Sequence, residues 1–310
     1  MCKIYFSDIS VVVSGPIFKN YTKESLTSIR KLMPNSEIVL SSWKSEDVSG
    51  LDFDKLVLSE DPGDNSICNI NRQIVSRLAG IKLASRKYVL AIRSESVILN
   101  TNFLNYFNKF SCFDNQYKFL NSRVVIPAAV PRRCGQIFHM GDWYYFGYKV
   151  DLIDCWDLPL QNLSLIPVEN QSFIGSPHRH VIVNFVKKHI PLDFNCESDT
   201  NLNNIEIYEK VLANNFIIVG IYDFGVASLK YPLKYKFIPR MYHYSVSYTF
   251  NEWIKLYNKF SNGDCKYSNV SFMEWFGVNV WSPLRKLGIT NYFVKLYYFI
   301  HKSYKGYKYY

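Results

Sequence analysis

The sequence has no apolar run long enough to cross a bilayer. Its most apolar stretches, such as residues 216–222, fall far short of the roughly 20 residues that a membrane-spanning helix needs. The N-terminus also lacks the unbroken apolar segment of a secretory signal peptide, because Asp8 and other polar residues interrupt it. We therefore expect a cytoplasmic protein.

Motifs of the common cofactor and metal sites are also missing. There is neither a Gly-x-Gly-x-x-Gly nor a Walker-type loop, which argues against a Rossmann dehydrogenase and against a P-loop NTPase. The seven cysteines are dispersed, with no pair at metal-ligand spacing, which argues against a zinc site and a disulfide framework. A reducing compartment is therefore expected.

Acidic residues are absent from residues 285–310, where Lys and Arg alternate with many Tyr and Phe. Such a basic, aromatic segment suits an anionic membrane surface. A nucleic-acid-binding tail or a plain solvated tail has the same composition. Because no RNP, KH, zinc-finger or helix-turn-helix signature accompanies it, we expect a peripheral protein at the inner face of the plasma membrane, with no nucleic-acid partner.

The hydrophobic pattern of the first hundred residues predicts an α/β fold. A short β-branched run that is typical of a buried strand occurs at residues 9–13, and further strands are expected at 37–41, 55–59 and 88–92. Helical spacing occurs at residues 22–32, with Thr22 as the N-cap, and at residues 71–84. This order predicts a mostly parallel, Rossmann-type sheet covered by helices. The second half is less regular, with a strand expected at 123–129 and helices at 102–110, 149–156 and 179–189.

Four polar loops follow the predicted strands. In a parallel sheet, ligands bind beyond the carboxyl ends of the strands, so these loops should open on one edge and line a ligand site. Its candidate residues are Ser14, Gly15, Pro16, Trp43, Asp61, Arg93, Ser94 and Glu95.

Glu95 is the first of these candidates to suggest chemistry. A carboxylate after a central strand suits a sugar hydroxyl, or Mg²⁺ or Mn²⁺ that bridges a diphosphate. Arg93 and Glu95 suit a plain ion pair at a strand end equally well. Two-acid motifs hold a metal better than a single acid, so metal dependence stays open.

Asn71 and Arg72 open the second predicted helix. A helix N-terminus and an Arg fork both favour anions, so this pair suits a phosphate group. Ordinary helix capping by Asn71 is at least as good an interpretation of that residue.

Two further groups lie in the second half. His139, Asp142, Trp143 and Tyr144 resemble a sugar subsite, in which rings face the pyranose and the acid contacts a hydroxyl, or else an aromatic core strand. Glu169 precedes a predicted helix, where it suits a catalytic base or merely an acid favoured by the helix dipole.

Eight segments between residues 8 and 175 carry a recognisable pattern. They are Ile9–Pro16, Ser28–Pro34, Glu37–Lys44, Asp47–Asp52, Glu60–Gly63, Asn71–Val75, Arg93–Glu95 and Asp142–Gly147. In this order and spacing they resemble the WavE lipopolysaccharide-synthesis family. The resemblance implies a GT-A-like glycosyltransferase of bacterial lipopolysaccharide, O-antigen or capsule synthesis. Its arginine-serine-acid element stands in the place of an Asp-x-Asp motif, with Glu95 where Asp is expected.

The resemblance also implies an organisation and a reaction. Residues 1–135 would bind a nucleotide-sugar donor, residues 136–284 the acceptor, and residues 285–310 the membrane surface. The enzyme would move a sugar from a UDP-hexose or from CMP-sialic acid to a hydroxyl of a lipid-pyrophosphate-linked oligosaccharide. A non-catalytic, membrane-associated assembly protein of the same pathway is the alternative.

Each candidate residue then has an expected role. Catalysis falls to Glu169, Asp142 and Glu95, with Glu169 as the base, and Mg²⁺ or Mn²⁺ at Glu95 is the one cofactor considered. Acceptor binding falls to His139, Trp143 and Tyr144. Donor binding falls to Ser14, Gly15, Pro16, Trp43, Asp61, Asn71, Arg72, Arg93 and Ser94.

Overall fold

The protein is described by a computed structural model. It describes residues 3–63, 65–128, 131–132, 137–141, 143–165, 177–194, 201–230, 247–266, 272–276, 279–280 and 284. Among these residues, no helix is both long and apolar enough to pass through a bilayer.

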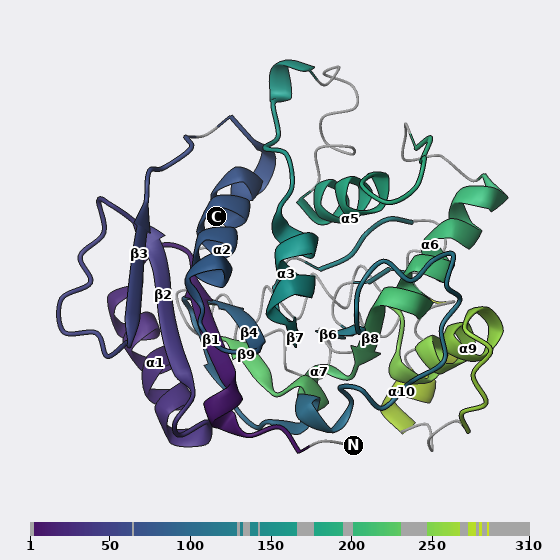
Figure 1. The fold of residues 1–310 in the computed structure, drawn as a ribbon, viewed down its shortest axis with the longest axis horizontal. Helices are drawn as coiled ribbons and strands as arrows, with labels where there is room; N and C mark the ends of the chain where they lie inside the picture. The colour runs from purple at the N-terminus through teal and green to yellow at the C-terminus, as the bar shows by residue number, and fades with distance from the viewer. Residues whose placement is uncertain are drawn as a thin grey trace.

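A seven-stranded sheet forms the centre of the structure (Figure 1). Its strands stand in the order β3-β2-β1-β4-β7-β6-β8, and β7 is antiparallel to both of its neighbours while the other pairs are parallel. This mostly parallel α/β sheet is consistent with a GT-A-like fold. The strands are β1 (Ile9–Ser14), β2 (Glu37–Trp43), β3 (Lys55–Ser59), β4 (Tyr88–Arg93), β6 (Val124–Pro127), β7 (Tyr145–Tyr148) and β8 (Phe216–Val219).

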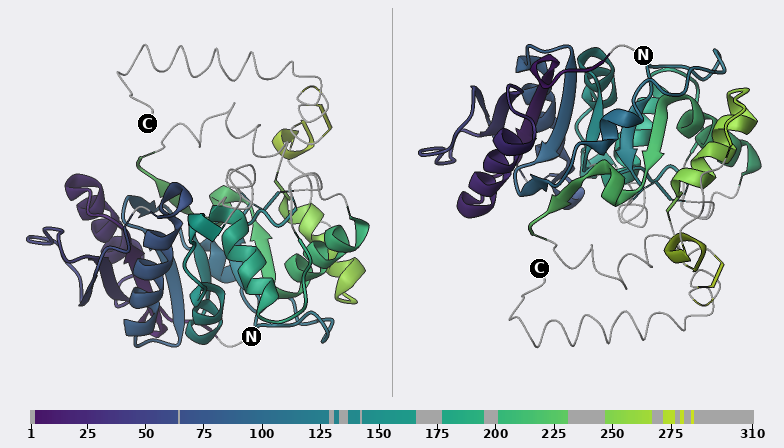
Figure 2. Two further views of the ribbon diagram at one scale, coloured as in Figure 1. Left: turned by 90° about the horizontal axis from the view of Figure 1, so that it is seen from above. Right: turned by 90° about the horizontal axis from the view of Figure 1, so that it is seen from below.

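Helices cover both faces of this sheet (Figure 2). One face carries α2, α3 and α5, and the other carries α1 together with a two-stranded ribbon of β5 and β9. The central strands β1 and β4 are buried along nearly their whole length, in agreement with their continuous apolar runs, whereas the edge strand β3 is only partly buried. These helices and strands are α1 (Lys19–Leu32), α2 (Ile70–Leu83), α3 (Lys149–Trp156), α5 (Pro177–Lys187), β5 (Ser96–Ile98) and β9 (Val226–Ser228).

The remaining helices lie beside β8 or in connections. Two of them, α6 (Leu202–Asn215) and α9 (Phe250–Phe260), pack against each other and against β8. The short ones are η1 (Phe6–Asp8), η2 (Ile67–Asn69), η3 (Asn102–Asn105), η4 (Leu163–Leu165), α7 (Ile221–Phe224) and α10 (Phe272–Phe276).

The predicted elements agree well with the observed ones, with two corrections. The strand at 55–59 and the helix at 149–156 occupy the expected residues. The helix expected at 102–110 is only the 3-10 turn η3. The prediction that Thr22 caps the first helix is wrong, because the helix begins at Lys19. Thr22 lies inside the helix, where its hydroxyl accepts the backbone N–H of Phe18 at 3.0 Å.

The sheet takes strands from both sides of residue 135, since β7 and β8 follow that position. The division into 1–135, 136–284 and 285–310 stays a prediction. The tail itself, residues 285–310, lies outside the described residues.

Glu37 links neighbouring segments at the edge of the sheet formed by the amino ends of the parallel strands. Its buried carboxylate accepts hydrogen bonds from the hydroxyl of Ser10 (2.5 Å) and from the backbone and hydroxyl of Ser85 (2.8 and 2.6 Å), and Lys55 Nζ lies 2.9 Å away. Burial disfavours the charged form, but these four donors outweigh it and lower the pKa of Glu37 to about 2.

We expect Glu37→Gln to lower the free energy of unfolding by about 3 kcal/mol at pH 7. Because the folded pKa is depressed, this contribution is present above the ordinary value of 4.5 and is lost as the pH falls towards 2. In urea denaturation, the gap in the free energy of unfolding between wild type and variant should be smaller at pH 3 than at pH 7. Glu24→Gln, on the exposed side of α1, is the control. An equal gap at both pH values would contradict this role.

Candidate functional site

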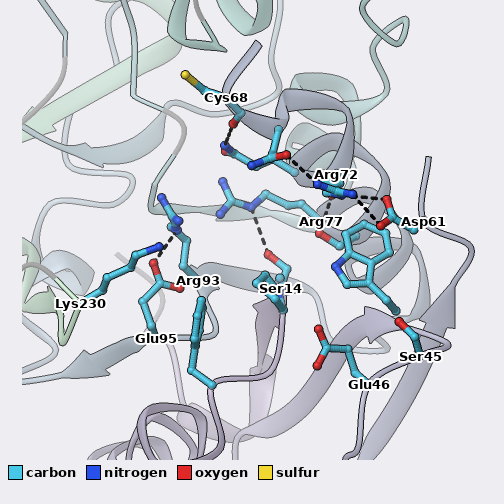
Figure 3. A pocket seen from close by; sticks show the side chains of 17 residues that line it. Ser14, Ser45, Glu46, Asp61, Cys68, Arg72, Arg77, Arg93, Glu95 and Lys230 are labelled. Atoms are coloured by element: carbon cyan, nitrogen blue, oxygen red, sulfur yellow. Dashed lines mark hydrogen bonds and ion pairs between the residues drawn. The ribbon is translucent and has the colours of Figure 1, made fainter. Parts of the chain in front are cut away.

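A cavity of about 330 Å³ opens at the carboxyl edge of the sheet (Figure 3). It lies beyond β1, β2, β3 and β4, where the sequence placed the four polar loops. Eight predicted site residues line it together: Ser14, Gly15, Pro16, Trp43, Asp61, Arg72, Arg93 and Glu95. The expectation that these loops converge on one edge is therefore confirmed.

The loop after β1 is shaped by its contact with the end of β4. Gly15 has a φ of +122°, a region that side chains rarely adopt, and its N–H donates to Ser41. Ser94 is fully buried and lies outside the cavity lining. Its hydroxyl donates to the carbonyl of Pro16 at 2.5 Å. Ser94 thus holds the loop that lines the cavity.

Asp61 and Arg72 form one wall of the cavity. The guanidinium contacts both carboxylate oxygens at 2.8 Å and also donates to the side chain of Asn69 at 2.7 Å. Arg72, together with the N–H of Gly63, lowers the pKa of Asp61. This fork fixes the side chain of Arg72, which comes from the first turn of α2.

Arg93 and Glu95 form a second pair at the end of β4. The Nε of Arg93 lies 2.8 Å from Oε1 of Glu95, and the side chain of Glu95 is only 1% exposed. β5 starts at the next residue, which fixes the backbone of Glu95 on both sides. The pair therefore presents a rigid, paired carboxylate to the cavity rather than a mobile surface acid.

Arg77 is a site residue that the sequence reasoning missed. It lies on α2 and is 1% exposed, with its Nε 3.4 Å from the hydroxyl of Ser14 and its Nη2 3.0 Å from the carbonyl of Trp143. Its guanidinium also packs 4.4 Å from the ring of Trp156. The signal was present, because position 77 falls on the apolar face marked by Ile74 and Ile81, and a charged residue there needs a special partner.

Lys230 also lines the cavity and was missed for another reason. β9 pairs with β5 so that Ser96 faces Ser228, and the N–H of Leu229 donates to the carbonyl of Glu95 at 2.8 Å. This ribbon brings Lys230 to the end of β4, and Figure 3 shows its amino group pointing toward the Arg93–Glu95 pair. No local sequence pattern predicts a pairing of such long range.

The sequence pattern of the family described as WavE lipopolysaccharide synthesis matches residues 9–287. The chain belongs to the WavE family. The match continues well past residue 175, where the recognisable segments end, and so it includes Lys230. A comparison with curated proteins gave no match.

Besides Ser94, four predicted site residues lie outside the cavity lining. Asn71 is buried and exchanges hydrogen bonds with the backbone of Gln161 at 2.6 and 2.8 Å, so it neither caps α2 nor lines the cavity. His139 and Tyr144 are buried, and the hydroxyl of Ser96 lies 3.1 Å from that of Tyr144. Trp143 is half-buried and contributes its carbonyl to Arg77.

The two remaining WavE candidates, Asp142 and Glu169, lie outside the described residues. Their expected roles, acceptor contact and catalytic base, stay predictions.

The residues around Glu95 do not fit a divalent cation. Mg²⁺ takes six oxygen ligands at short distances, and a lone carboxylate that already pairs with Arg93 is a poor start for such a shell. Over the described ranges, no three His, Cys, Asp or Glu side chains gather closely enough to hold a metal. Arg93 and Lys230 would moreover repel a dication at this point.

Proposed function

We propose that this WavE-family chain is a glycosyltransferase that binds a nucleotide-sugar donor in the cavity beyond β1 and β4. The observation that carries the proposal is the lining of that cavity, which combines four basic side chains with Trp43 at the carboxyl edge of a GT-A-like sheet. Basic side chains at such an edge suit the phosphates of a nucleotide, and a ring suits its base or sugar.

The proposed reaction is the transfer of a sugar to an acceptor hydroxyl. A hydroxyl of a lipid-linked oligosaccharide attacks the anomeric carbon, the bond from that carbon to the phosphate oxygen breaks, and an acid near the acceptor takes the hydroxyl proton. Arg72 and Arg93 meet the charge that develops on the leaving nucleotide. The donor is a UDP-hexose or CMP-sialic acid, and the product belongs to lipopolysaccharide, O-antigen or capsule.

A thermal-shift panel with UDP, GDP and CMP tests this function, because a ligand of the folded state raises the melting temperature. Cys68 gives a second readout, since this exposed residue belongs to the cavity lining. The bound nucleotide should slow alkylation of Cys68 at least about tenfold, while the exposed Cys112 outside the cavity reacts at an unchanged rate. If no nucleotide has either effect, the chain is the non-catalytic assembly protein.

The roles of the two acids outside the described residues can be separated by kinetics. We expect Glu169→Gln to slow turnover with little change in donor affinity, because loss of a general base acts on the transition state. Asp142→Asn should chiefly weaken acceptor binding. Steady-state kinetics with both substrates distinguish these effects, and the opposite outcome would exchange the two roles.

We also propose that residues 285–310 attach the enzyme to the inner face of the plasma membrane, where a lipid-linked acceptor lies. Each basic residue near an anionic surface contributes on the order of 1 kcal/mol. Deleting the chain from Tyr292 onward should therefore release it from anionic vesicles in a sedimentation assay, while activity on a short soluble acceptor survives. Undiminished vesicle binding would contradict this role.

A further inference from the structure

Three cations and one acid line the β4 end of the cavity. Arg77, Arg93 and Lys230 line the cavity there, and Glu95 pairs with Arg93 at 2.8 Å. Figure 3 shows the guanidinium of Arg77 and the amino group of Lys230 pointing toward that pair. These four side chains, here called the cation cluster, carry a formal charge of +2.

The other charged residues of the cavity lie apart from the cation cluster. Asp61 and Arg72 cancel each other through two contacts of 2.8 Å. Glu46 follows β2 and lies away from Lys230 in Figure 3. The excess positive charge is therefore concentrated at one end of the cavity, the end beside the loop after β1.

Two members of the cation cluster are buried in the fold, whereas Lys230 is exposed at the mouth of the cavity. Arg77 and Glu95 are each 1% exposed, and Arg77 is held by Ser14 and the carbonyl of Trp143. The β5–β9 ribbon fixes the backbone beside Lys230, whose Nζ lies 5.3 Å from the ring of Phe18. Donors that are already oriented bind an anion without the cost of ordering them.

We propose that the cation cluster binds the two phosphates of a nucleoside diphosphate sugar directly, with no divalent metal ion. This inference rests on the proposed function and selects among its donors. A diphosphate diester carries both of its negative charges on adjacent phosphates and matches the cluster, whereas CMP-sialic acid has one charge on its phosphate and the other on the carboxylate of the sugar. An arginine has five N–H donors, so Arg93 can hold Glu95 and a phosphate oxygen together.

Calorimetric titration of the intact chain tests the proposal, using UDP, GDP, UMP, GMP and CMP in EDTA and then in Mn²⁺. One diphosphate should bind in EDTA with a Kd within about twofold of its value in Mn²⁺, and at least about tenfold more tightly than its own monophosphate. Lys230→Ala should lower the affinity for that diphosphate at least about tenfold and the affinity for the monophosphate by a smaller factor. Lys19→Ala is the matched control, since Lys19 is an exposed lysine that starts α1 outside the cavity lining.

The outcomes separate this proposal from the one on which it rests. Binding that requires Mn²⁺, a monophosphate or CMP that binds as tightly as any diphosphate, or a folded Lys230→Ala variant with unchanged affinity would each overturn the direct diphosphate site and leave a glycosyltransferase in place. No binding of any nucleotide would overturn the proposed function itself. Arg93→Lys is a second test variant. It keeps the positive charge but loses the planar guanidinium that can hold Glu95 and a phosphate oxygen together, so it should also lower the affinity for the diphosphate.

Discussion

Glu95→Ala is expected to lower kcat/KM for sugar transfer by roughly 10²–10³-fold, as loss of one preorganised stabilising group does in other active sites. The carboxylate is 1% exposed and holds Arg93 through a contact of 2.8 Å. Without it, Arg93 loses the partner that orients it toward the donor phosphates, and the donor sugar loses a hydrogen-bond acceptor.

Because Glu95 is buried, the fold must be measured alongside the activity. Glu95→Gln keeps the shape of the side chain and removes its charge, so it should melt close to wild type and still lose most of the transfer rate. Glu24→Ala, at an exposed position of α1, should leave kcat/KM unchanged. An active Glu95→Ala enzyme would remove this residue from the site.

Arg123→Met is expected to cost about 3 kcal/mol or more of the free energy of unfolding. Arg123 is 1% exposed and donates to the carbonyls of Ala213 (2.6 Å), Phe110 (2.8 Å) and Cys112 (2.5 Å), as well as to the hydroxyl of Ser261 at 3.1 Å.

The guanidinium of Arg123 joins three parts of the chain that are distant in sequence. It lies between the rings of Phe113 and Tyr257, at 3.9 and 4.8 Å, and burial lowers its pKa to about 10. Methionine fills similar space but removes the guanidinium donor from the carbonyls of Phe110, Cys112 and Ala213, of which Ala213 keeps the hydroxyl of Ser261 at 3.4 Å. A buried carbonyl left without a donor costs about 1–3 kcal/mol.

Urea denaturation of the Arg123 variants measures this cost directly. Arg123→Lys keeps the positive charge without the planar fork, so it should recover only a small part of the loss. Arg86→Met, at an exposed arginine, is the control. If Arg123→Lys matches wild type, charge rather than the fork stabilises this region.

Much of the fold was predictable because the central strands are buried on both faces. A β-branched run such as residues 9–13 then predicts a buried strand, and parallel strands bring their carboxyl ends to one edge. The common edge of the parallel strands predicted that Ser14, Asp61 and Glu95 line one cavity, although they are far apart in the sequence.

The rest depended on interactions that sequence patterns do not encode. Thr22 has the chemistry of an N-cap, yet α1 begins three residues earlier, at Lys19. Arg77 was recognisable only as a charged residue on an apolar face. Lys230 reaches the cavity through the pairing of β5 with β9, which depends on register between two short strands. Asn71 was placed near the correct helix turn, but its amide bonds to Gln161 instead of facing the cavity.

The β5–β9 ribbon limits how parts of this protein can be exchanged between members of the family. Lys230 and the carbonyl of Trp143 that holds Arg77 both follow residue 135, while their partners precede it. A chimaera that takes residues 1–135 from one family member and the remainder from another would therefore combine two unmatched halves of the proposed donor cavity. Donor preference should transfer between relatives only when the ribbon and the residues before β7 are exchanged together with the N-terminal strands.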